Sequence, residues 1–154
     1  AMLKYVNTDI VFQEIPDETT LAINISRCPC HCPGCHSSYL AQDFGNPLST
    51  DALDQLIADN DGLVTCVCLM GGDAEPQSVN HLAAHVREKH PGMRVGWYSG
   101  RLRIDHAIDK HNFDYIKVGP YIKHLGPLNC RTTNQRLYHV VGNQLHDITA
   151  SFWK

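Results

Sequence analysis

Hydrophobic and polar positions follow patterns along this chain that predict four strands in its central part. Residues 21–26 (LAINIS) alternate between apolar and polar side chains, as a half-buried strand does. Residues 63–70 (LVTCVCLM) are almost all apolar, which is typical of a strand covered by helices on both faces. Two further strands are predicted at 93–98 (MRVGWY) and 114–118 (DYIKV).

Helices are predicted between these strands. Ser49 or Thr50 is a suitable cap for a helix that continues to about residue 59. Pro76 favours the start of a second helix, and a His-Pro-Gly sequence ends it. A third helix is expected near 102–111.

The alternation of strands and helices predicts an α/β fold with a mainly parallel sheet and right-handed crossovers. Near the C-terminus, residues 136–141 and 144–148 flank Gly142-Asn143, a pair typical of a hairpin turn. Ligands bind beyond the carboxyl ends of parallel strands. Three segments fall at such ends here: the cysteine-rich segment after the first strand, Gly71-Gly72-Asp73 after the second, and Ser99-Gly100 after the third.

The composition is that of an ordinary globular domain. The chain has 154 residues, of which 43% are hydrophobic and 19% charged, and we expect one domain over 1–154. The formal net charge is −3 and Lys and Arg form no block, so nucleic acid is not expected as a partner. Since there is no apolar run of about 18 residues and no charged-then-apolar leader, we expect a cytoplasmic protein that does not bind membranes.

Cysteine usage points to a metal. Seven cysteines are present, and four of them fall between residues 28 and 35, which in a reducing cytosol favours metal binding over disulfides. Cys28, Cys32 and Cys35 form a Cys-x3-Cys-x2-Cys sequence. Most iron–sulfur clusters take four thiolates; three would leave one iron of a [4Fe–4S] cluster open to a small molecule. A zinc knuckle with Cys30 as the fourth ligand is the alternative.

Other potential ligands have simpler interpretations. Cys66 and Cys68 lie inside a predicted buried strand and are expected to be core residues. His81 and His85 share a helix face at i, i+4, but no third ligand is near in sequence, so a solvated face is favoured over a metal site. Cys130 has no assigned role.

The cysteine spacing is the signature of the radical S-adenosylmethionine superfamily, and Met70-Gly71-Gly72-Asp73 resembles its Gly-Gly-Glu motif. The resemblance implies a minimal partial (β/α) barrel in which the amino and carboxylate groups of S-adenosylmethionine chelate the open iron. Two glycines let the cofactor approach the backbone, and the Asp73 carboxylate would bind its ammonium group, with Glu75 as the alternative. Taken alone, the motif is equally typical of a strand-to-helix turn with Asp73 as a helix cap.

The resemblance extends to other strand ends. Trp97-Tyr98-Ser99-Gly100 is similar to the family's strand end beside the ribose and carboxylate of the cofactor. Gly34 and His36 flank the third cysteine, at the place where the loop backbone of family members lies near the adenine. The implied metal ligands are Cys28, Cys32 and Cys35, and the implied cofactor-binding residues are Gly34, His36, Gly71, Gly72, Asp73, Ser99 and Gly100. No side chain is expected to act as a catalytic acid or base.

Within the superfamily, the chain resembles the activating proteins of anaerobic (class III) ribonucleotide reductases. The resemblance rests on Cys32-Pro33-Gly34-Cys35-His36, Gly119-Pro120-Tyr121-Ile122 and Asn134-Gln135-Arg136, with departures at residues 15–19 and at Val118. It implies an activase that reductively cleaves S-adenosylmethionine and generates a glycyl radical on anaerobic ribonucleoside-triphosphate reductase, using a one-electron donor such as flavodoxin. An activator of another glycyl-radical enzyme, and a non-catalytic iron–sulfur or zinc-binding module, are the alternatives.

Overall fold

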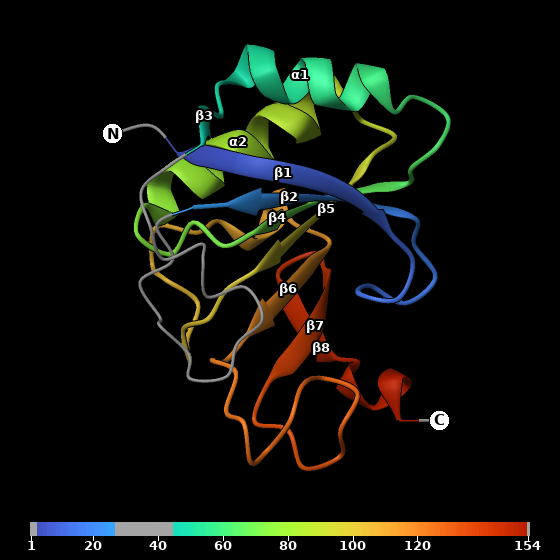
Figure 1. Ribbon diagram of the computed structural model, residues 1–154, viewed down its shortest axis with the longest axis vertical. Helices are drawn as coiled ribbons and strands as arrows, with labels where there is room; N and C mark the ends of the chain where they lie inside the picture. The colour runs from blue at the N-terminus through green and yellow to red at the C-terminus, as the bar shows by residue number, and fades with distance from the viewer. Residues whose placement is uncertain (1–2, 27–44, 154) are drawn as a thin grey trace.

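The structure is a computed structural model that describes residues 3–26 and 45–153. Within these ranges, eight strands form one open sheet in the order β3-β1-β2-β4-β5-β6-β7-β8 (Figure 1). The predicted cluster ligands Cys28, Cys32 and Cys35, together with Gly34 and His36, lie outside the described residues.

The centre of the sheet is parallel, as the sequence predicts. The four parallel strands, in spatial order, are β2 (Thr20–Ile25), β4 (Cys66–Met70), β5 (Arg94–Tyr98) and β6 (Tyr115–Val118). Their carboxyl ends therefore lie along the same edge of the sheet. This edge is where the sequence places the candidate site.

The two flanks of the sheet are antiparallel. On one side, β1 (Lys4–Val11) pairs with β2 and with the short β3 (Asn46–Pro47). On the other side, the predicted hairpin is present as β7 (Arg136–Val141) and β8 (Gln144–Asp147), and the turn glycine, Gly142, has φ of 62°.

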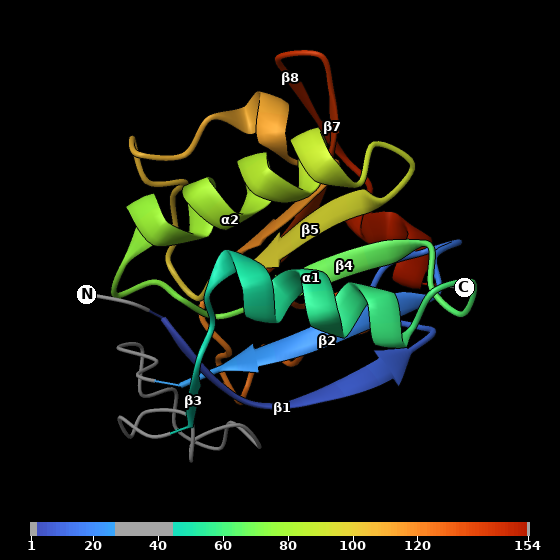
Figure 2. The same cartoon turned by 90° about the horizontal axis from the view of Figure 1, so that it is seen from above.

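Two α-helices lie over one face of the sheet (Figure 2). They are α1 (Thr50–Asp59) and α2 (Pro76–Lys89). The Ser49 Oγ accepts a hydrogen bond from the Ala52 N–H and caps α1, while Pro76 stands in the first turn of α2. Both starting points agree with the sequence prediction. Neither helix, nor any other in the part of the chain described, is long and apolar enough to cross a membrane.

The helix-covered face holds the larger apolar cluster. Buried side chains from both helices pack there against side chains of the central strands; the helix residues are Leu53, Ile57, Val79, Leu82, Ala83 and Val86.

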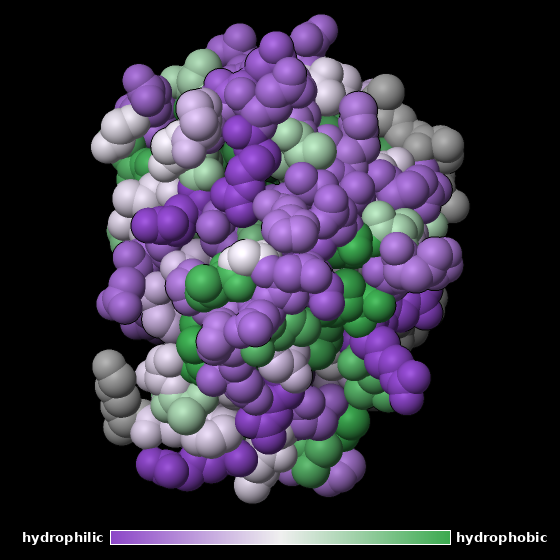
Figure 3. Space-filling view, turned by 180° about the vertical axis from the view of Figure 1, so that it is seen from behind, coloured by the Kyte–Doolittle hydropathy of each residue, from purple (hydrophilic) through white to green (hydrophobic). Residues whose placement is uncertain are grey.

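Polar residues dominate the molecular surface in Figure 3, which shows the side opposite to Figure 1.

The other face of the sheet has no α-helix over it in the described ranges. Cys66 and Cys68 of β4 point there and pack with Ile15, Leu128 and residues near the 3-10 helix η3 (Thr149–Phe152). The prediction that helices cover both faces of this strand is therefore wrong. On the face without an α-helix, β4 is buried by loops and by η3.

The predicted helix near 102–111 is also wrong. Only the 3-10 helix η2 (Lys110–Asn112) forms in this region. The Asp105 Oδ1 accepts a hydrogen bond from the Ala107 N–H at 2.8 Å, and the Asp109 Oδ1 accepts one from the His111 N–H at 3.0 Å. Hydrogen bonds from an aspartate side chain to a backbone N–H two positions later compete with the backbone hydrogen bonds of a helix and favour turns.

Candidate functional site

The turn after β4 is joined to the end of β5. Gly71 and Gly72 adopt positive φ values of 111° and 87°, which glycine tolerates best. The Gly71 N–H donates to the Tyr98 carbonyl at 3.0 Å, and the Trp97 indole N–H donates to the Gly71 carbonyl at 2.7 Å. The turn is thus held in place by β5.

This turn also contacts the end of β2, from which the chain continues into the cysteine-rich segment. A Cβ atom on Gly71 would lie 3.3 Å from the Ile25 carbonyl oxygen. Ile25 is the last residue of β2, and Ser26, which follows it, is held by a hydrogen bond from its N–H to the Lys4 carbonyl at 3.0 Å. Ile25 and Ser26, the last described residues before the segment with the predicted ligands, are therefore fixed beside the paired glycines.

The Asp73 carboxylate connects two of the predicted site segments. It is only 6% exposed. Its Oδ1 accepts a hydrogen bond from the Ser99 hydroxyl at 2.5 Å, and its Oδ2 accepts one from the Gly100 N–H at 2.8 Å. The structure thus brings together Asp73, Ser99 and Gly100, which are 26 and 27 positions apart.

Asp73 does not cap α2. The residue at the N-cap position is Glu75, whose side chain makes no capping hydrogen bond, and the Asp73 carboxylate points to β5 instead. The helix-cap interpretation of Asp73 is therefore wrong. Glu75 is itself buried, at 7% exposure, in the link between the glycine pair and the helix.

Gly72 has a packing role that the sequence did not reveal. A Cβ atom there would lie 2.6 Å from Val79 Cγ2 and 3.6 Å from Ile25 Cδ1. These side chains belong to α2 and β2, so the absence of a Cβ lets the helix start close to the sheet. Approach of a cofactor to the same backbone stays a prediction.

A buried lysine supports the Ser99-Gly100 turn, and sequence reasoning missed it. Lys117 of β6 is 8% exposed, and its Nζ donates to the Ser99 carbonyl at 2.9 Å and to the Gly119 carbonyl at 3.2 Å. The Lys117 carbonyl accepts from the Ser99 N–H at 2.8 Å. A lysine between Ile116 and Val118, inside an otherwise apolar strand, was the available signal.

The C-terminal segments that carry part of the family resemblance meet at the same place. The Gln135 side-chain amide donates to the Gly119 carbonyl at 3.4 Å, and that of Asn134 donates to the Pro120 carbonyl at 3.0 Å. A Cβ atom on Gly119 would lie 3.1 Å from the Gln135 Cα. The Gly119 carbonyl thus accepts hydrogen bonds from both Gln135 and Lys117. Since Lys117 also bonds to Ser99, these segments help to hold the Ser99-Gly100 turn.

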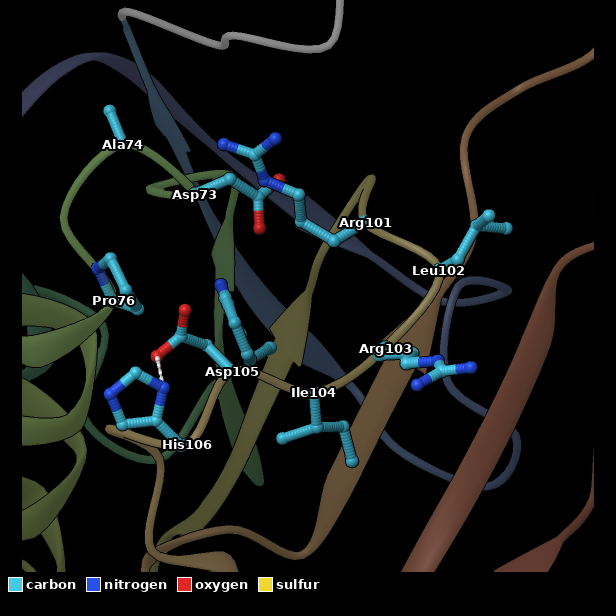
Figure 4. Close-up of a pocket in the computed structure, with 10 residues that line it drawn as sticks. Asp73, Ala74, Pro76, Arg101, Leu102, Arg103, Ile104, Asp105 and His106 are labelled. Carbon is cyan, nitrogen blue, oxygen red and sulfur yellow. Dashed lines mark ion pairs between the residues drawn. The ribbon is translucent and has the colours of Figure 1, made fainter.

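A pocket of about 700 Å³ opens in front of Asp73 (Figure 4). One wall comes from Asp73, Ala74, Pro76 and Trp97, and the other from residues 101–106. In Figure 4 the Arg101 side chain extends toward Asp73. The volume lies within the usual range for small-molecule sites, roughly 300–1,000 Å³.

The cysteines of β4 are unsuitable as metal ligands. Cys66 and Cys68 are fully buried, and burial raises the pKa of both thiols far above the usual range. A metal ligand must be a thiolate, which such burial disfavours. The prediction that both are core residues is confirmed.

Within the described ranges, the histidines of α2 are likewise not grouped with enough other ligand side chains to bind a metal. His81 is exposed, and the Nε2 of His85 lies 2.8 Å from the Asp54 Oδ1, which the His90 Nε2 also approaches at 2.7 Å. In the ranges that the structure describes, no group of three or more His, Cys, Asp or Glu residues is arranged to hold a metal ion.

In a comparison with protein families, the model of the 4Fe–4S single cluster domain matches residues 19–118. The matched region begins just before β2, includes the cysteine-rich segment and ends at Val118. Comparisons with curated proteins and with solved structures gave no match. Because the match covers well over half of its residues, the chain belongs to the family of 4Fe–4S single cluster domains.

Proposed function

We propose that this chain is a radical S-adenosylmethionine activase that generates a glycyl radical on an anaerobic ribonucleoside-triphosphate reductase. The observation that carries the proposal is the cluster of Gly71, Gly72 and Asp73 with Ser99-Gly100, next to Ile25 at the end of β2, the strand that precedes the cysteine-rich segment in the sequence. A chain that only stores or transfers electrons at a 4Fe–4S cluster would not need this second constellation.

The ligands proposed for the cluster are Cys28, Cys32 and Cys35. The buried thiols of Cys66 and Cys68 are unsuited to the role, which leaves the cysteine-rich segment as the source of neighbouring thiolates. Three ligands leave one iron open, which is the arrangement that chelation by a small molecule requires.

S-adenosylmethionine fits the polar groups at the pocket. Its ammonium group needs a buried acceptor, and the Asp73 carboxylate is oriented by the Ser99 hydroxyl and the Gly100 N–H. When bound, the cluster and S-adenosylmethionine would supply one-electron cleavage of a carbon–sulfur bond.

The protein's own residues would position the cofactor. Lys117 holds the Ser99-Gly100 turn, the turn orients Asp73, and the glycine pair keeps the backbone close to β2. The four parallel strands would then form the core of the partial (β/α) barrel that the resemblance implies.

The experiment is anaerobic reconstitution with iron and sulfide, followed by mixing with the class III reductase, S-adenosylmethionine and a reductant such as reduced flavodoxin. We expect four irons per chain, cofactor cleavage, and a doublet in the electron paramagnetic resonance spectrum from a glycyl radical on the reductase. Cys28→Ala, Cys32→Ala and Cys35→Ala should each lose the cluster, whereas the matched Cys30→Ala should keep it. A single zinc with no cleavage would contradict the proposal, and cleavage without a doublet would contradict the reductase as the partner and favour another glycyl-radical enzyme.

A further inference from the structure

The segment that leaves the candidate site after β5 exposes an apolar side chain between two arginines. Leu102 is 72% exposed, and Arg101 and Arg103 on either side are also exposed. Among the large hydrophobic residues that the structure describes, none is more exposed than Leu102. A single exposed leucine is ordinary on a protein surface; what distinguishes Leu102 is its place between two exposed arginines at the edge of the pocket.

The backbone of this segment is fixed to the site, although its side chains are free of the core. The Arg101 N–H donates to the Ser99 hydroxyl at 3.1 Å, and the Arg101 carbonyl accepts from the Gly119 N–H at 2.6 Å. In Figure 4, Leu102 and Arg103 extend away from Asp73 on the outer rim of the pocket. Leu102 and Arg103 therefore extend from a backbone that is already held by hydrogen bonds at Arg101. Less conformational entropy is then lost when a partner docks.

The two positive charges lack counterparts within the described ranges. No described acidic side chain forms an ion pair with Arg101 or Arg103; the nearby Asp105 lies 3.6 Å from the His106 Nδ1 instead. The whole chain carries a net charge of −3, so this positive pair runs against its overall charge. A partner that lies over the segment needs negative charge beside an apolar side chain.

We propose that Arg101, Leu102 and Arg103 form a docking rim for an acidic segment of the protein substrate, one that places carboxylates around an apolar side chain. This inference rests on the proposed function, because an enzyme that modifies another protein must hold it at the mouth of its site. A nucleic acid fits less well, since Asp73 and Asp105 line the same pocket and would repel phosphates.

The test compares two variants with the same charge change. Leu102→Asp with Arg103→Glu alters the outer rim, and Leu63→Asp with Lys89→Glu is the matched control, on exposed residues that precede β4 and β5. The iron-loaded full chain is titrated anaerobically against the class III reductase at several salt concentrations. Iron content and unfolding of each variant are measured in parallel.

We expect the rim variant to bind the reductase about tenfold more weakly or worse, with a flatter salt dependence, and to keep the iron content and the stability of the wild type. The control should match the wild type, and Arg103→Ala should weaken binding in the same direction by a smaller factor.

Equal reductase binding by rim and control variants would overturn the docking rim. So would a loss of iron or of folding in the rim variant that matches its loss of reductase binding, or a loss confined to binding of a single-stranded oligonucleotide. If the wild type itself fails to bind the reductase, the proposed function falls, and the rim falls with it.

Discussion

A carboxylate is buried at each end of the parallel strands, and the surroundings of the two carboxylates differ. At the amino ends, the Glu18 carboxylate accepts hydrogen bonds from the Thr65 hydroxyl at 2.6 Å and the Tyr115 hydroxyl at 2.8 Å. It also forms an ion pair with the Arg94 Nε at 3.0 Å. Burial, with a further contribution from Glu18, raises the pKa of Tyr115. This carboxylate is enclosed by side chains from neighbouring strands.

At the carboxyl ends, Asp73 is held by a hydroxyl and a backbone N–H and borders a pocket. Two glycines with positive φ precede it, and Lys117 fixes the turn that faces it. The comparison teaches that burial and hydrogen bonding alone do not distinguish a binding group from a structural one. The adjoining pocket and the glycine backbone are the features on which we base the proposal that Asp73 binds a ligand.

Removal of the structural carboxylate should give the largest effect on stability. Glu18→Ala leaves the buried Tyr115 hydroxyl without its acceptor and removes the ion pair with Arg94, so we expect a loss of about 2–3 kcal/mol in the free energy of unfolding. Chemical denaturation measures this, with the exposed Glu88→Ala as the control. Affinity for S-adenosylmethionine in the folded protein should stay unchanged; a selective loss of affinity would erase the distinction between the two ends.

Neutralisation of Asp73 should have the opposite profile. Asp73→Asn keeps the shape of the side chain but removes the charge that we propose for the ammonium group. We expect S-adenosylmethionine to bind roughly 10- to 150-fold more weakly, which corresponds to about 1.5–3 kcal/mol. Isothermal titration with the iron-loaded protein tests this, and iron content should remain normal. An affinity equal to that of the wild type would show that Asp73 is only structural.

Lys117→Met should lie between these two cases. The substitution keeps an unbranched side chain over the Tyr98 ring but removes the donors to the Ser99 and Gly119 carbonyls. We expect about 1–2 kcal/mol less stability and a cofactor affinity several-fold lower, because the turn behind Asp73 loosens. The exposed Lys123→Met is the matched control. Lower stability with unaltered affinity would limit Lys117 to the fold.

A third carboxylate, on the helix layer, should give the smallest effect. Hydrogen bonding to His90, and to a lesser degree to His85, lowers the pKa of Asp54. A lowered folded pKa adds stability that is complete above the unfolded value of about 3.9 and is lost as pH falls through the folded pKa.

The Asp54 side chain is 38% exposed, so solvent screening limits this contribution to about 0.5 kcal/mol. Denaturation of the wild type and of Asp54→Asn at pH 6 and pH 3 provides the measurement. The two proteins should differ less at pH 3 than at pH 6; a constant difference would contradict the role of the ion pairs.

Local patterns predicted much of the fold. Ser49 and Pro76 begin the helices where their capping and backbone properties place them, and apolar runs mark the central strands. The helix near 102–111 failed because Asp105 and Asp109 bond to nearby backbone N–H groups.

Contacts between distant parts of the sequence were harder to predict. The meeting of Asp73 with Ser99 followed from the rule on strand ends, since both follow parallel strands. The hydrogen bond between Glu18 and Tyr115 spans 97 positions, and no local pattern indicates it. Strand β1 also escaped prediction, because as a flanking strand it has mostly half-exposed side chains with no regular alternation.

The central claim is that S-adenosylmethionine binds an open iron of the cluster beside the Asp73 site. Electron paramagnetic resonance of the reduced, iron-loaded protein tests this most directly, since a ligand on the open iron changes the spectrum of the cluster itself. The account predicts that S-adenosylmethionine shifts the signal of the wild type, and that Asp73→Asn needs a higher concentration for the same shift. A normal cluster signal that S-adenosylmethionine leaves unchanged at any concentration would contradict it.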